Sequence, residues 1–384
     1  IENNENGIYI TSSYLNTIRN NTIYSNDGDG ILLASSDQQT ITNNRIYNNT
    51  NGIHLISSGG SGNIITENEI YRNIGSGILL ENSKASTAGN NEMIGNEIYN
   101  NDESGICLYS SNTNSIQQNE IYDNNYGIHL YSSGGNFLIR NIIHENVNGI
   151  ICNISDDNTF DSNNISWNSL HGIYFVSSNG NRIDNNTFSY NYIGLHLYIS
   201  SEGDQYKISG NQIWNNTIGV LLNVSDSNYF GYNLPNILWN NTYGIYIKSS
   251  MNNHFNNNII SNNSYGLYLC QASSIEINAN KIDNNTIGIY INESSTDNVI
   301  TENTFILNSP FQYGAYIEGE LCKNNKIYSN NFINITAISR SLGYDSGGGN
   351  SWYNPDSEDK EGNYWGNYIQ RYANATMLPE NNSW

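Results

Sequence analysis

The chain repeats one short unit along most of its length. In each unit a Gly is followed by Ile, Val, Leu or Ala, and these Gly residues recur at intervals of 22 to 28 residues. The consensus is N-x-I-Y-x-N-x-x-G-I-x-L-x-x-S-x-x-N-x-I-x-x-N, with a clear copy at residues 119–141. A fixed period of this length is typical of a solenoid. The repeat Gly residues are Gly7, Gly30, Gly52, Gly77, Gly105, Gly127, Gly149, Gly172, Gly194, Gly219, Gly244, Gly266, Gly288 and Gly314.

Each unit predicts three short strands. Residues 128–130, 137–139 and 142–143 show the pattern in one copy, because apolar side chains there favour strands and the unit is too short to add a helix. A single strand cannot bury its inner face, so successive units must stack. The sequence therefore predicts an all-β protein, a single parallel β-helix of about 14–15 coils over residues 1–339, followed by an irregular C-terminal cap over residues 340–384. We expect Gly and Asn at turns that need left-handed backbone.

Asparagine is the commonest residue, at 76 of 384 positions. Many of these residues share one register of the repeat, where stacked amides would bond from coil to coil. We therefore interpret most Asn as structural. The register contains Asn21, Asn44, Asn68, Asn96, Asn119, Asn141, Asn163, Asn186, Asn211, Asn258, Asn280 and Asn303.

The charge excludes one class of function. The chain has 14 basic and 35 acidic residues, a net charge of −21, whereas a nucleic-acid binder needs a basic face. The apolar runs are too short to span a membrane. A hydrophobic content of 37%, which includes 30 Tyr, argues against disorder despite the abundance of Asn.

The repeat resembles the NosD-like proteins, nominally periplasmic copper-binding proteins within the carbohydrate-binding and sugar-hydrolase superfamily of right-handed β-helices. It is similar above all to their Asn-rich relatives among archaeal cell-surface proteins. The resemblance covers residues 1 to about 340, and residues 362–368 (GNYWGNY) look like the family's end motif. The Asp/Gly-rich run that usually follows that motif is replaced by IQRYAN. The resemblance implies a right-handed helix and an extracellular location, but the scaffold hosts enzymes, adhesins and structural proteins.

The first residue, Ile1, lies in the middle of a repeat and no signal peptide precedes it. We expect a processed chain or a fragment, with the open first coil covered by a preceding segment or another subunit.

Metal sites have few candidates. His54, His129 and His196 share an outward position but lie three coils apart, about 14 Å, so they cannot hold one copper ion. Two acidic segments resemble parts of calcium loops, although a Gly turn and a solvated acidic loop explain them without an ion. The calcium candidates are Asp27, Asp29, Asp356, Glu358, Asp359 and Glu361. No other cofactor is expected.

The four Cys residues are too far apart for internal disulfides, and no Cys-x-x-Cys pair suggests zinc. Cys152 occupies an inward position and is expected to be a core thiol. Cys107 and Cys270 fall on outward positions, where they could link subunits by disulfides.

No catalytic residue is predicted. Carboxylates of polysaccharide enzymes must meet on neighbouring coils, whereas Asp156 and Asp157 lack a basic residue in register. A polysaccharide lyase or glycoside hydrolase is the alternative.

Fourteen N-x-S/T sequons are present, about as many as chance predicts for this composition. Four of them, at residues 215, 240, 262 and 284, form one column. The candidate N-glycosylation sites are Asn20, Asn48, Asn153, Asn164, Asn185, Asn215, Asn223, Asn240, Asn262, Asn284, Asn292, Asn334, Asn374 and Asn381.

Tyrosines form outward columns, most of them two residues after the repeat Gly or at the Tyr of N-x-I-Y. Long exposed apolar strips usually mark interaction sites, and Tyr combines contact area with a polar tip. The alternative is that Tyr simply favours strands. The predicted strip contains Tyr9, Tyr24, Tyr47, Tyr71, Tyr99, Tyr109, Tyr122, Tyr131, Tyr174, Tyr198, Tyr246, Tyr268, Tyr290 and Tyr316.

Together these features predict a non-enzymatic extracellular, cell-surface protein that assembles with copies of itself, end to end or laterally, as a surface-layer, sheath, filament or adhesin-stalk subunit. The alternative is a carbohydrate-binding or polysaccharide-degrading β-helix, with the Tyr columns as a platform for sugar rings.

Overall fold

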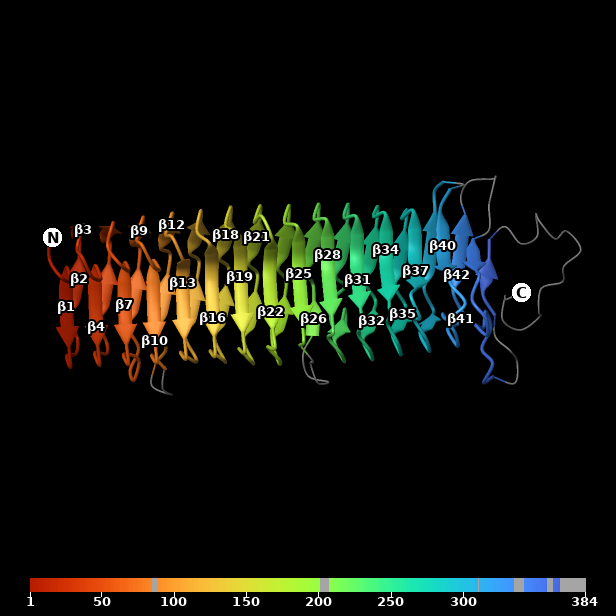
Figure 1. The fold of residues 1–384 in the computed structure, drawn as a ribbon, viewed down its shortest axis with the longest axis horizontal. Helices are drawn as coiled ribbons and strands as arrows, with labels where there is room; N and C mark the ends of the chain where they lie inside the picture. The colour runs from red at the N-terminus through yellow and green to blue at the C-terminus, as the bar shows by residue number, and fades with distance from the viewer. Residues whose placement is uncertain (85–88, 201–206, 310, 335–341, 358–361, 367–384) are drawn as a thin grey trace, which may run out of the picture. The chain divides into compact units, whose positions relative to one another are not determined.

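The computed structural model describes residues 1–84, 89–200, 207–309, 311–334, 342–357 and 362–366, which form strands and turns (Figure 1). Among them, no helix is long and apolar enough to cross a membrane. The chain divides into two compact units, Ile1–Tyr192 and Ile193–Trp384. Both are right-handed parallel β-helices with three sheets, which confirms the predicted fold, and we describe each by itself.

The first unit stacks eight coils, each contributing one strand to each sheet. Equivalent residues pair in register, as Ile106 with Ile128 and Leu108 with Leu130. Sheet 1 contains β1 (Ile8–Thr11), β4 (Ile31–Ala34), β7 (Ile53–Ile56), β10 (Ile78–Glu81), β13 (Ser104–Tyr109), β16 (Tyr126–Tyr131), β19 (Asn148–Asn153) and β22 (His171–Val176). Sheet 2 contains β2 (Thr17–Arg19), β5 (Thr40–Thr42), β8 (Ile64–Thr66), β11 (Glu92–Ile94), β14 (Ser115–Gln117), β17 (Phe137–Ile139), β20 (Thr159–Asp161) and β23 (Arg182–Asp184). Sheet 3 contains β3 (Thr22–Tyr24), β6 (Arg45–Tyr47), β9 (Glu69–Tyr71), β12 (Glu97–Tyr99), β15 (Glu120–Tyr122), β18 (Ile142–His144), β21 (Asn164–Ser166) and β24 (Thr187–Ser189).

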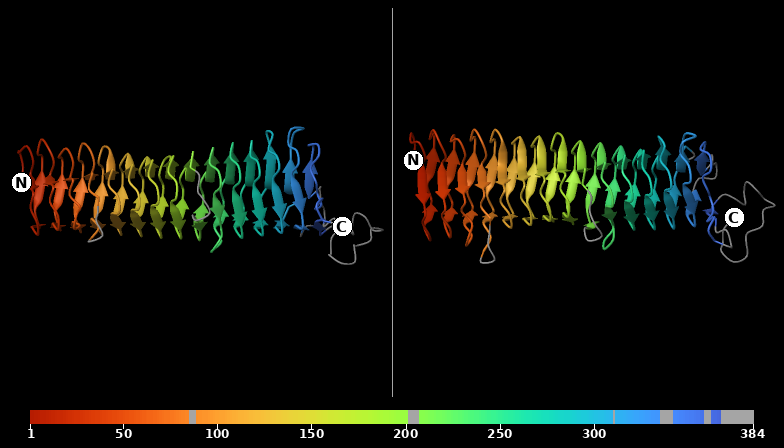
Figure 2. Two further views of the ribbon diagram at one scale, coloured as in Figure 1. Left: turned by 90° about the horizontal axis from the view of Figure 1, so that it is seen from below. Right: turned by 60° about the horizontal axis from the view of Figure 1, so that its bottom comes forward.

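The second unit repeats the arrangement (Figure 2). Its sheet 1 contains β25 (Ile193–Tyr198), β28 (Ile218–Asn223), β31 (Tyr243–Lys248), β34 (Tyr265–Cys270), β37 (Ile287–Asn292), β40 (Tyr313–Ile317) and β43 (Gly343–Asp345). Sheet 2 contains β26 (Lys207–Ser209), β29 (Tyr229–Phe230), β32 (His254–Asn256), β35 (Glu276–Asn278), β38 (Val299–Thr301) and β41 (Lys326–Tyr328). Sheet 3 contains β27 (Gln212–Trp214), β30 (Ile237–Trp239), β33 (Ile259–Ser261), β36 (Lys281–Asp283), β39 (Thr304–Leu307), β42 (Asn331–Asn334) and β44 (Tyr364–Trp365).

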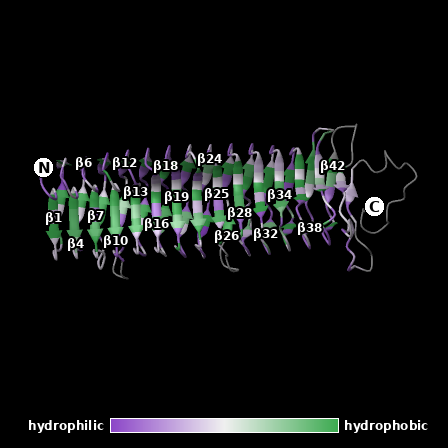
Figure 3. Cartoon of the chain, viewed as in Figure 1, coloured by the Kyte–Doolittle hydropathy of each residue, from purple (hydrophilic) through white to green (hydrophobic). Residues whose placement is uncertain are grey.

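The core of each coil is built from one or two inward side chains per strand. In the coil that begins at β16, Ile128, Leu130, Leu138 and Ile143 are all 0% exposed. Their neighbours in each strand face outward, which is the period-two alternation that the sequence predicts. Figure 3 shows the resulting hydrophobic strands and hydrophilic turns.

The repeat Gly residues have a different role from the one predicted. Their backbone is not left-handed. A Cβ atom on Gly127 would lie 2.5 Å from the Gly149 carbonyl oxygen and 2.7 Å from Cγ2 of Ile143. Close approach of the next coil therefore selects Gly at this position.

Left-handed backbone occurs at other corners of the coil, where Gly135 has φ of 65°, as predicted for Gly at turns. Asn48 and Asn100 follow the prediction, with φ of 54°, but Trp167 and Tyr190 have φ of 58° and 57°. Such a conformation is costly for bulky residues.

The predicted Asn register is confirmed as a ladder within each unit. Each Nδ2 donates to Oδ1 of the next Asn at 2.9–3.1 Å, as in Asn119 to Asn141 and Asn141 to Asn163. Three residues outside the predicted set extend the ladder in the second unit: Asn236, Asn330 and Asn363.

Further ladders occupy other corners of the coil. A second Asn ladder in the first unit includes Asn101, Asn124 and Asn146, with amide contacts of 3.0 and 3.1 Å. A Ser ladder occupies the corner that follows sheet 1, where Ser111 N donates to the Ser133 hydroxyl at 3.0 Å. These ladders satisfy backbone and side-chain groups that would otherwise be buried without partners.

The stacking continues past the predicted boundary at residue 339. Strand β43 pairs with β40, and β44 pairs with β42. Asn330 donates to Asn363 Oδ1 at 3.0 Å, and the ring of Trp365 stacks on Phe332 with centroids 4.4 Å apart. The described residues of the GNYWGNY motif, 362–366, therefore belong to the solenoid.

Candidate functional site

The predicted tyrosines of sheet 3 form a stacked column in the first unit. Centroids of successive rings lie 4.9–5.1 Å apart and their planes differ by at most 11°. Each ring covers the face of the next, so Tyr71 is only 6% exposed. We call this set the tyrosine ladder: Tyr24, Tyr47, Tyr71, Tyr99, Tyr122 and His144.

Acidic residues bind the hydroxyls of the tyrosine ladder. Tyr99 donates to Glu69 and Tyr122 to Glu97, both at 2.8 Å. Burial first, and then these carboxylates, raise the pKa of both phenols. The guanidinium of Arg45 pairs with Glu69 at 3.0 Å and lies 5.3 Å from the Tyr71 ring. The ladder thus shows ring edges and hydroxyls to solvent, and its flat faces are not available for sugar stacking.

The outer face of sheet 1 in the second unit carries a wider group of aromatic rings. Its side chains stand one residue before or two residues after the repeat Gly, apart from Tyr344, which pairs with Tyr316. We call it the tyrosine face: Tyr243, Tyr246, Tyr265, Tyr268, Tyr290, Tyr313, Tyr316 and Tyr344, from β31, β34, β37, β40 and β43. Four of these, Tyr243, Tyr265, Tyr313 and Tyr344, are absent from the predicted strip, although the first three directly precede a repeat Gly.

An apolar patch supports one end of the tyrosine face. Ile193, Ile218 and Leu221 lie on the outer side of the sheet, yet they are 6–9% exposed because Tyr243 and Tyr246 pack against them. The rings of the face are thereby anchored on rigid strands.

The rings of Tyr246, Tyr268, Tyr290 and Tyr316 are turned relative to one another, whereas Tyr243 and Tyr265 stack in parallel, with planes 9° apart. Interplanar angles are 75° between Tyr246 and Tyr268, 46° between Tyr268 and Tyr290, and 38° between Tyr290 and Tyr316. The column before the Gly causes this, since Tyr265 packs edge-to-face against Tyr268 at 5.2 Å. Rings tilted in this way cover one another less completely than parallel rings, and Tyr246, Tyr268, Tyr290 and Tyr316 are half-buried.

A polar column borders the tyrosine face. Asn292 Nδ2 donates to the Tyr268 hydroxyl at 2.9 Å, and the Tyr290 hydroxyl donates to Glu318. Burial first, and then Glu318, raise the pKa of Tyr290, so its phenol stays protonated at neutral pH. The face therefore combines apolar rings with oriented hydrogen-bonding groups, as small-molecule and sugar sites require.

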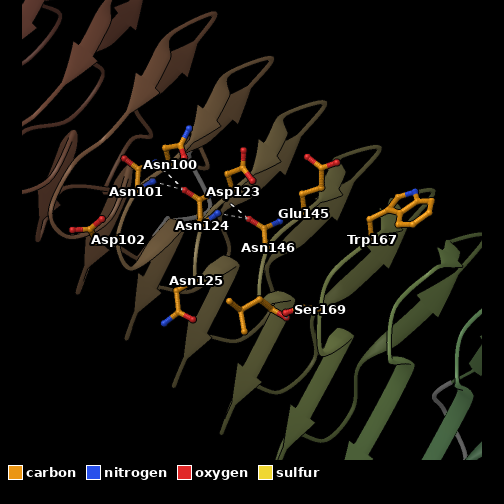
Figure 4. A pocket seen from close by; sticks show the side chains of 11 residues that line it. Asn100, Asn101, Asp102, Asp123, Asn124, Asn125, Glu145, Asn146, Trp167 and Ser169 are labelled. Atoms are coloured by element: carbon orange, nitrogen blue, oxygen red, sulfur yellow. Dashed lines mark hydrogen bonds between the residues drawn. The ribbon is translucent and has the colours of Figure 1, made fainter.

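The first unit has a shallow groove of about 670 Å³ along the sheet-3 corner. Figure 4 shows Asp123, Glu145 and Trp167 projecting from successive turns beside the second Asn ladder, with Asp102 at one end. The indole of Trp167 is 58% exposed and stacks on Tyr190 with centroids 4.1 Å apart. This groove is the second candidate surface, and its lining includes no basic residue.

Three adjacent coils bring Asp29, His54 and Glu81 together, a cluster that the sequence did not reveal. His54 Nδ1 lies 2.8 Å from Asp29, and Nε2 lies 3.3 Å from Glu81. The His54 side chain is only 12% exposed, which corrects its assignment to the surface. Burial lowers the pKa of His54, but the bond to Asp29 and the two negative charges outweigh it and raise the pKa overall. Since Asp29 and Glu81 each lie beside one ring nitrogen, we interpret His54 as structural. The sequence signal that could have revealed this cluster is the position of His54, two residues after the repeat Gly52.

The calcium candidates are dispersed. Asp27 is exposed, whereas Asp29 accepts from Asn51 at 2.8 Å and pairs with His54. Asp356 pairs with Lys326. Glu358, Asp359 and Glu361 lie outside the described residues. Calcium at either segment stays a prediction.

The two proposed linking cysteines are poorly suited to that role. Cys107 is partly buried, and burial, followed by Glu103 and Glu81, raises the pKa of its thiol to about 12. Cys270 is 3% exposed, so its predicted outward exposure is wrong: its thiol donates to Glu293 at 3.1 Å under the neighbouring Tyr246. Burial and this bond raise the pKa of Cys270 to about 11. Thiolates are the reactive form, so both cysteines should react slowly. Cys152 is a core thiol, as predicted, at 0% exposure.

The sequon residues avoid the buried ladders. Eleven of them, from Asn20 to Asn292, are exposed or half-buried, and Asn215, Asn240, Asn262 and Asn284 share one corner with φ of 52–56°. The Asn334 side chain and residues 374 and 381 lie outside the described part of the chain. Use of these sites stays a prediction.

The remaining tyrosines of the predicted strip lie singly or in small groups. Tyr109 and Tyr131 stack with centroids 5.1 Å apart, and Tyr174 packs on His171 at 4.5 Å. Tyr198 lies 6.4 Å from His196, and Tyr9 is 58% exposed.

The sequence profile of a family described as periplasmic copper-binding protein (NosD) matches residues 1–104, 86–234 and 206–369. No curated protein matches significantly. The solved structures similar to this chain include the A-modules of two Azotobacter vinelandii mannuronan C-5 epimerases. AlgE6 has a TM-score of 0.51 and 15% identity, covering 85% of this chain and 89% of that module. AlgE4 has a TM-score of 0.49 and 14% identity, covering 84% and 90%. At an identity this low, the structural similarity to the AlgE6 module shows a shared fold alone.

The family description raises the question of copper, and the described residues do not fit a copper centre. Among them, no three His, Cys, Asp or Glu side chains converge on one point. Asp29 and Glu81 approach opposite nitrogens of His54, so they cannot share a ligand position with it. The profile match nevertheless spans most of the chain, and the β-helix, its ladders and its C-terminal motif agree with it. The chain belongs to the NosD family.

Proposed function

We propose that this chain binds a polysaccharide outside the cytoplasm, without altering it, through the tyrosine face. The observation that carries the proposal is the tilt of the rings on β31, β34, β37 and β40, which leaves aromatic surface open beside fixed polar groups. A pyranose ring has an apolar C–H face and a rim of hydroxyls, so such a surface complements it. The tyrosine ladder of the first unit lacks this property because its rings cover one another.

Two comparisons support this assignment. The similar epimerase modules are named for action on mannuronan, a polysaccharide, and the family is described as periplasmic. A location at the cell surface is the narrower form of the same proposal.

The test is binding of oligosaccharides by calorimetry, with Tyr268→Ala and Tyr290→Ala as variants. We expect each to weaken binding at least about tenfold, or about 1.4 kcal/mol. Tyr14→Ala is the matched control, because Tyr14 is 61% exposed and lies outside the face. Trp167→Ala tests the groove in the same assay. Equal affinity in the Tyr268, Tyr290 and Tyr14 variants would refute the tyrosine face as the binding surface.

Catalysis is tested alongside binding. We expect no new reducing ends or unsaturated products when the protein is incubated with a bound polysaccharide. Product formation would make the chain a polysaccharide-degrading enzyme.

Self-assembly through copies of this chain is a separate prediction. Analytical ultracentrifugation across a dilution series checks it, since an assembling protein shows a concentration-dependent mass. Loss of that mass dependence in Tyr268→Ala would assign the tyrosine face to assembly and count against sugar binding.

A further inference from the structure

We infer that the ligand of the tyrosine face is a glycan without acidic groups, and that protonated amino groups on such a glycan strengthen its binding. This inference rests on the proposed function and specifies its ligand class. It arises from the charges that surround the rings.

Carboxylates outnumber cations around the face. On β31, β34, β37, β40 and β43, and at the residue that directly follows each strand, the described acidic residues are Glu293, Glu318 and Asp345, and the one basic residue is Lys248. Glu293 and Glu318 are exposed, and each receives a hydrogen bond, from Cys270 and Tyr290 respectively. Their charge is therefore held next to the rings.

A polyuronate carries one carboxylate per sugar, so several would face these residues at once. Juxtaposed like charges disfavour binding across an interface. The net charge of −21 adds a repulsive long-range field. The groove of the first unit offers no substitute, since Asp102, Asp123 and Glu145 line it without a cation.

An amine-bearing glycan should be attracted to the carboxylates around the face. Its ammonium groups can pair with Glu293 or Glu318, and they can also lie over tyrosine ring faces, which attract cations. A neutral glycan retains the ring contacts but lacks this added term.

The experiment uses two matched pairs of oligosaccharides, measured by calorimetry with the full chain. Mannuronate oligomers are compared with the mannose oligomers obtained by reducing their carboxyl groups, and glucosamine oligomers with their N-acetylated forms. Each pair differs in charge at constant linkage. We expect the uncharged mannose form to bind at least about tenfold more tightly than mannuronate, and the glucosamine form more tightly than its N-acetylated form. High salt should remove the second difference.

Variants of the two glutamates test whether they cause the preference for glucosamine. Glu293→Gln and Glu318→Gln keep side-chain size, and we expect them to reduce the preference for glucosamine without changing affinity for the neutral forms. Glu276→Gln is the control, because Glu276 is an exposed carboxylate on sheet 2.

The outcomes separate the two proposals. Tyr268-dependent binding in which mannuronate equals or exceeds its reduced form would overturn the charge inference and leave the proposed function standing. Tyr268-dependent binding in which glucosamine oligomers bind no more tightly than their N-acetylated forms would also overturn the charge inference and leave the proposed function standing. Absence of Tyr268-dependent binding for all four oligomers would overturn both.

Discussion

At the scale of single residues, the spacing between coils determines which side chains are accepted. Neighbouring coils approach so closely that Gly127 has no space for a Cβ atom, and corner amides meet the next coil at hydrogen-bond distance. Asn suits these corners because its amide both donates and accepts along one axis. The high Asn content therefore reflects geometry imposed at every coil.

Asn141→Ala should be strongly destabilising. Asn141 accepts from the backbone and side chain of Asn119, both at 3.1 Å, and donates to Asn163 and the Ile116 carbonyl, both at 2.9 Å. Leaving these buried groups without partners should cost about 2–5 kcal/mol. Urea denaturation measures the loss. Asn164→Ala is the control, because Asn164 is exposed, and it should change stability by less than about 0.5 kcal/mol. Similar losses of stability in the two variants would contradict a stabilising role for the Asn ladder.

His54 should make stability depend on pH. Its pKa is raised in the folded state, so the Asp29 and Glu81 contacts stabilise the fold fully below the unfolded pKa of about 6.5. That contribution is lost as pH rises through the folded pKa. His54→Gln should therefore lower the melting temperature more at pH 5.5 than at pH 9, measured by thermal denaturation. A constant difference across this range would show that His54 is uncharged in the fold.

At the scale of elements, the same residue type serves two purposes according to what stands beside it. In sheet 3 of the first unit, Tyr71 and its neighbours stack in parallel and close their faces. In sheet 1 of the second unit, the tyrosines that precede the repeat Gly pack edge-to-face against the tyrosines that follow it, as Tyr243 and Tyr265 do against Tyr268, and tilt their rings. The first arrangement stabilises the coil stack, whereas the second forms the face that we propose binds a glycan.

Tyr71→Ala should destabilise the first unit without affecting sugar binding. Tyr71 is buried between Tyr47 and Tyr99, with both centroid distances at 4.9 Å, and its loss should cost about 2–4 kcal/mol. The control is Tyr109→Ala, because Tyr109 is 46% exposed and stacks only on Tyr131 among the described rings. Denaturant midpoints and oligosaccharide titrations check both expectations. A loss of binding in folded Tyr71→Ala protein would place sugar contacts on the ladder.

At the scale of the whole molecule, the solenoid is a chain of nearest-neighbour contacts. Within each unit, every inner coil pairs with the coil before and the coil after it, as β16 does with β13 and β19. Stability in such folds is close to a sum of local terms, so opening can be confined to part of the structure.

Gly127→Ala should therefore open only nearby coils. The added methyl would clash with the Gly149 carbonyl, and hydrogen exchange should accelerate around residues 105–153 while β34 and β37 keep their protection. Gly348→Ala is the control, since a Cβ atom there meets nothing within 4 Å. Faster exchange throughout the described residues of both units would instead show global cooperativity.

The sequence by itself determined the fold of this protein. A strict period, two outward positions per strand and one Asn register are local signals, and they repeat often enough to define coils, sheets and a ladder. They could not show why Gly127 must be Gly, that Cys270 is buried, or that Asp29, His54 and Glu81 meet. The sequence predicted only half of the tyrosine face. Tyr265 and Tyr243 were missed, because they belong to a second column whose effect is to tilt the neighbouring rings. These features depend on side chains from different coils packing at about 5 Å, and that contact exists only in the tertiary structure.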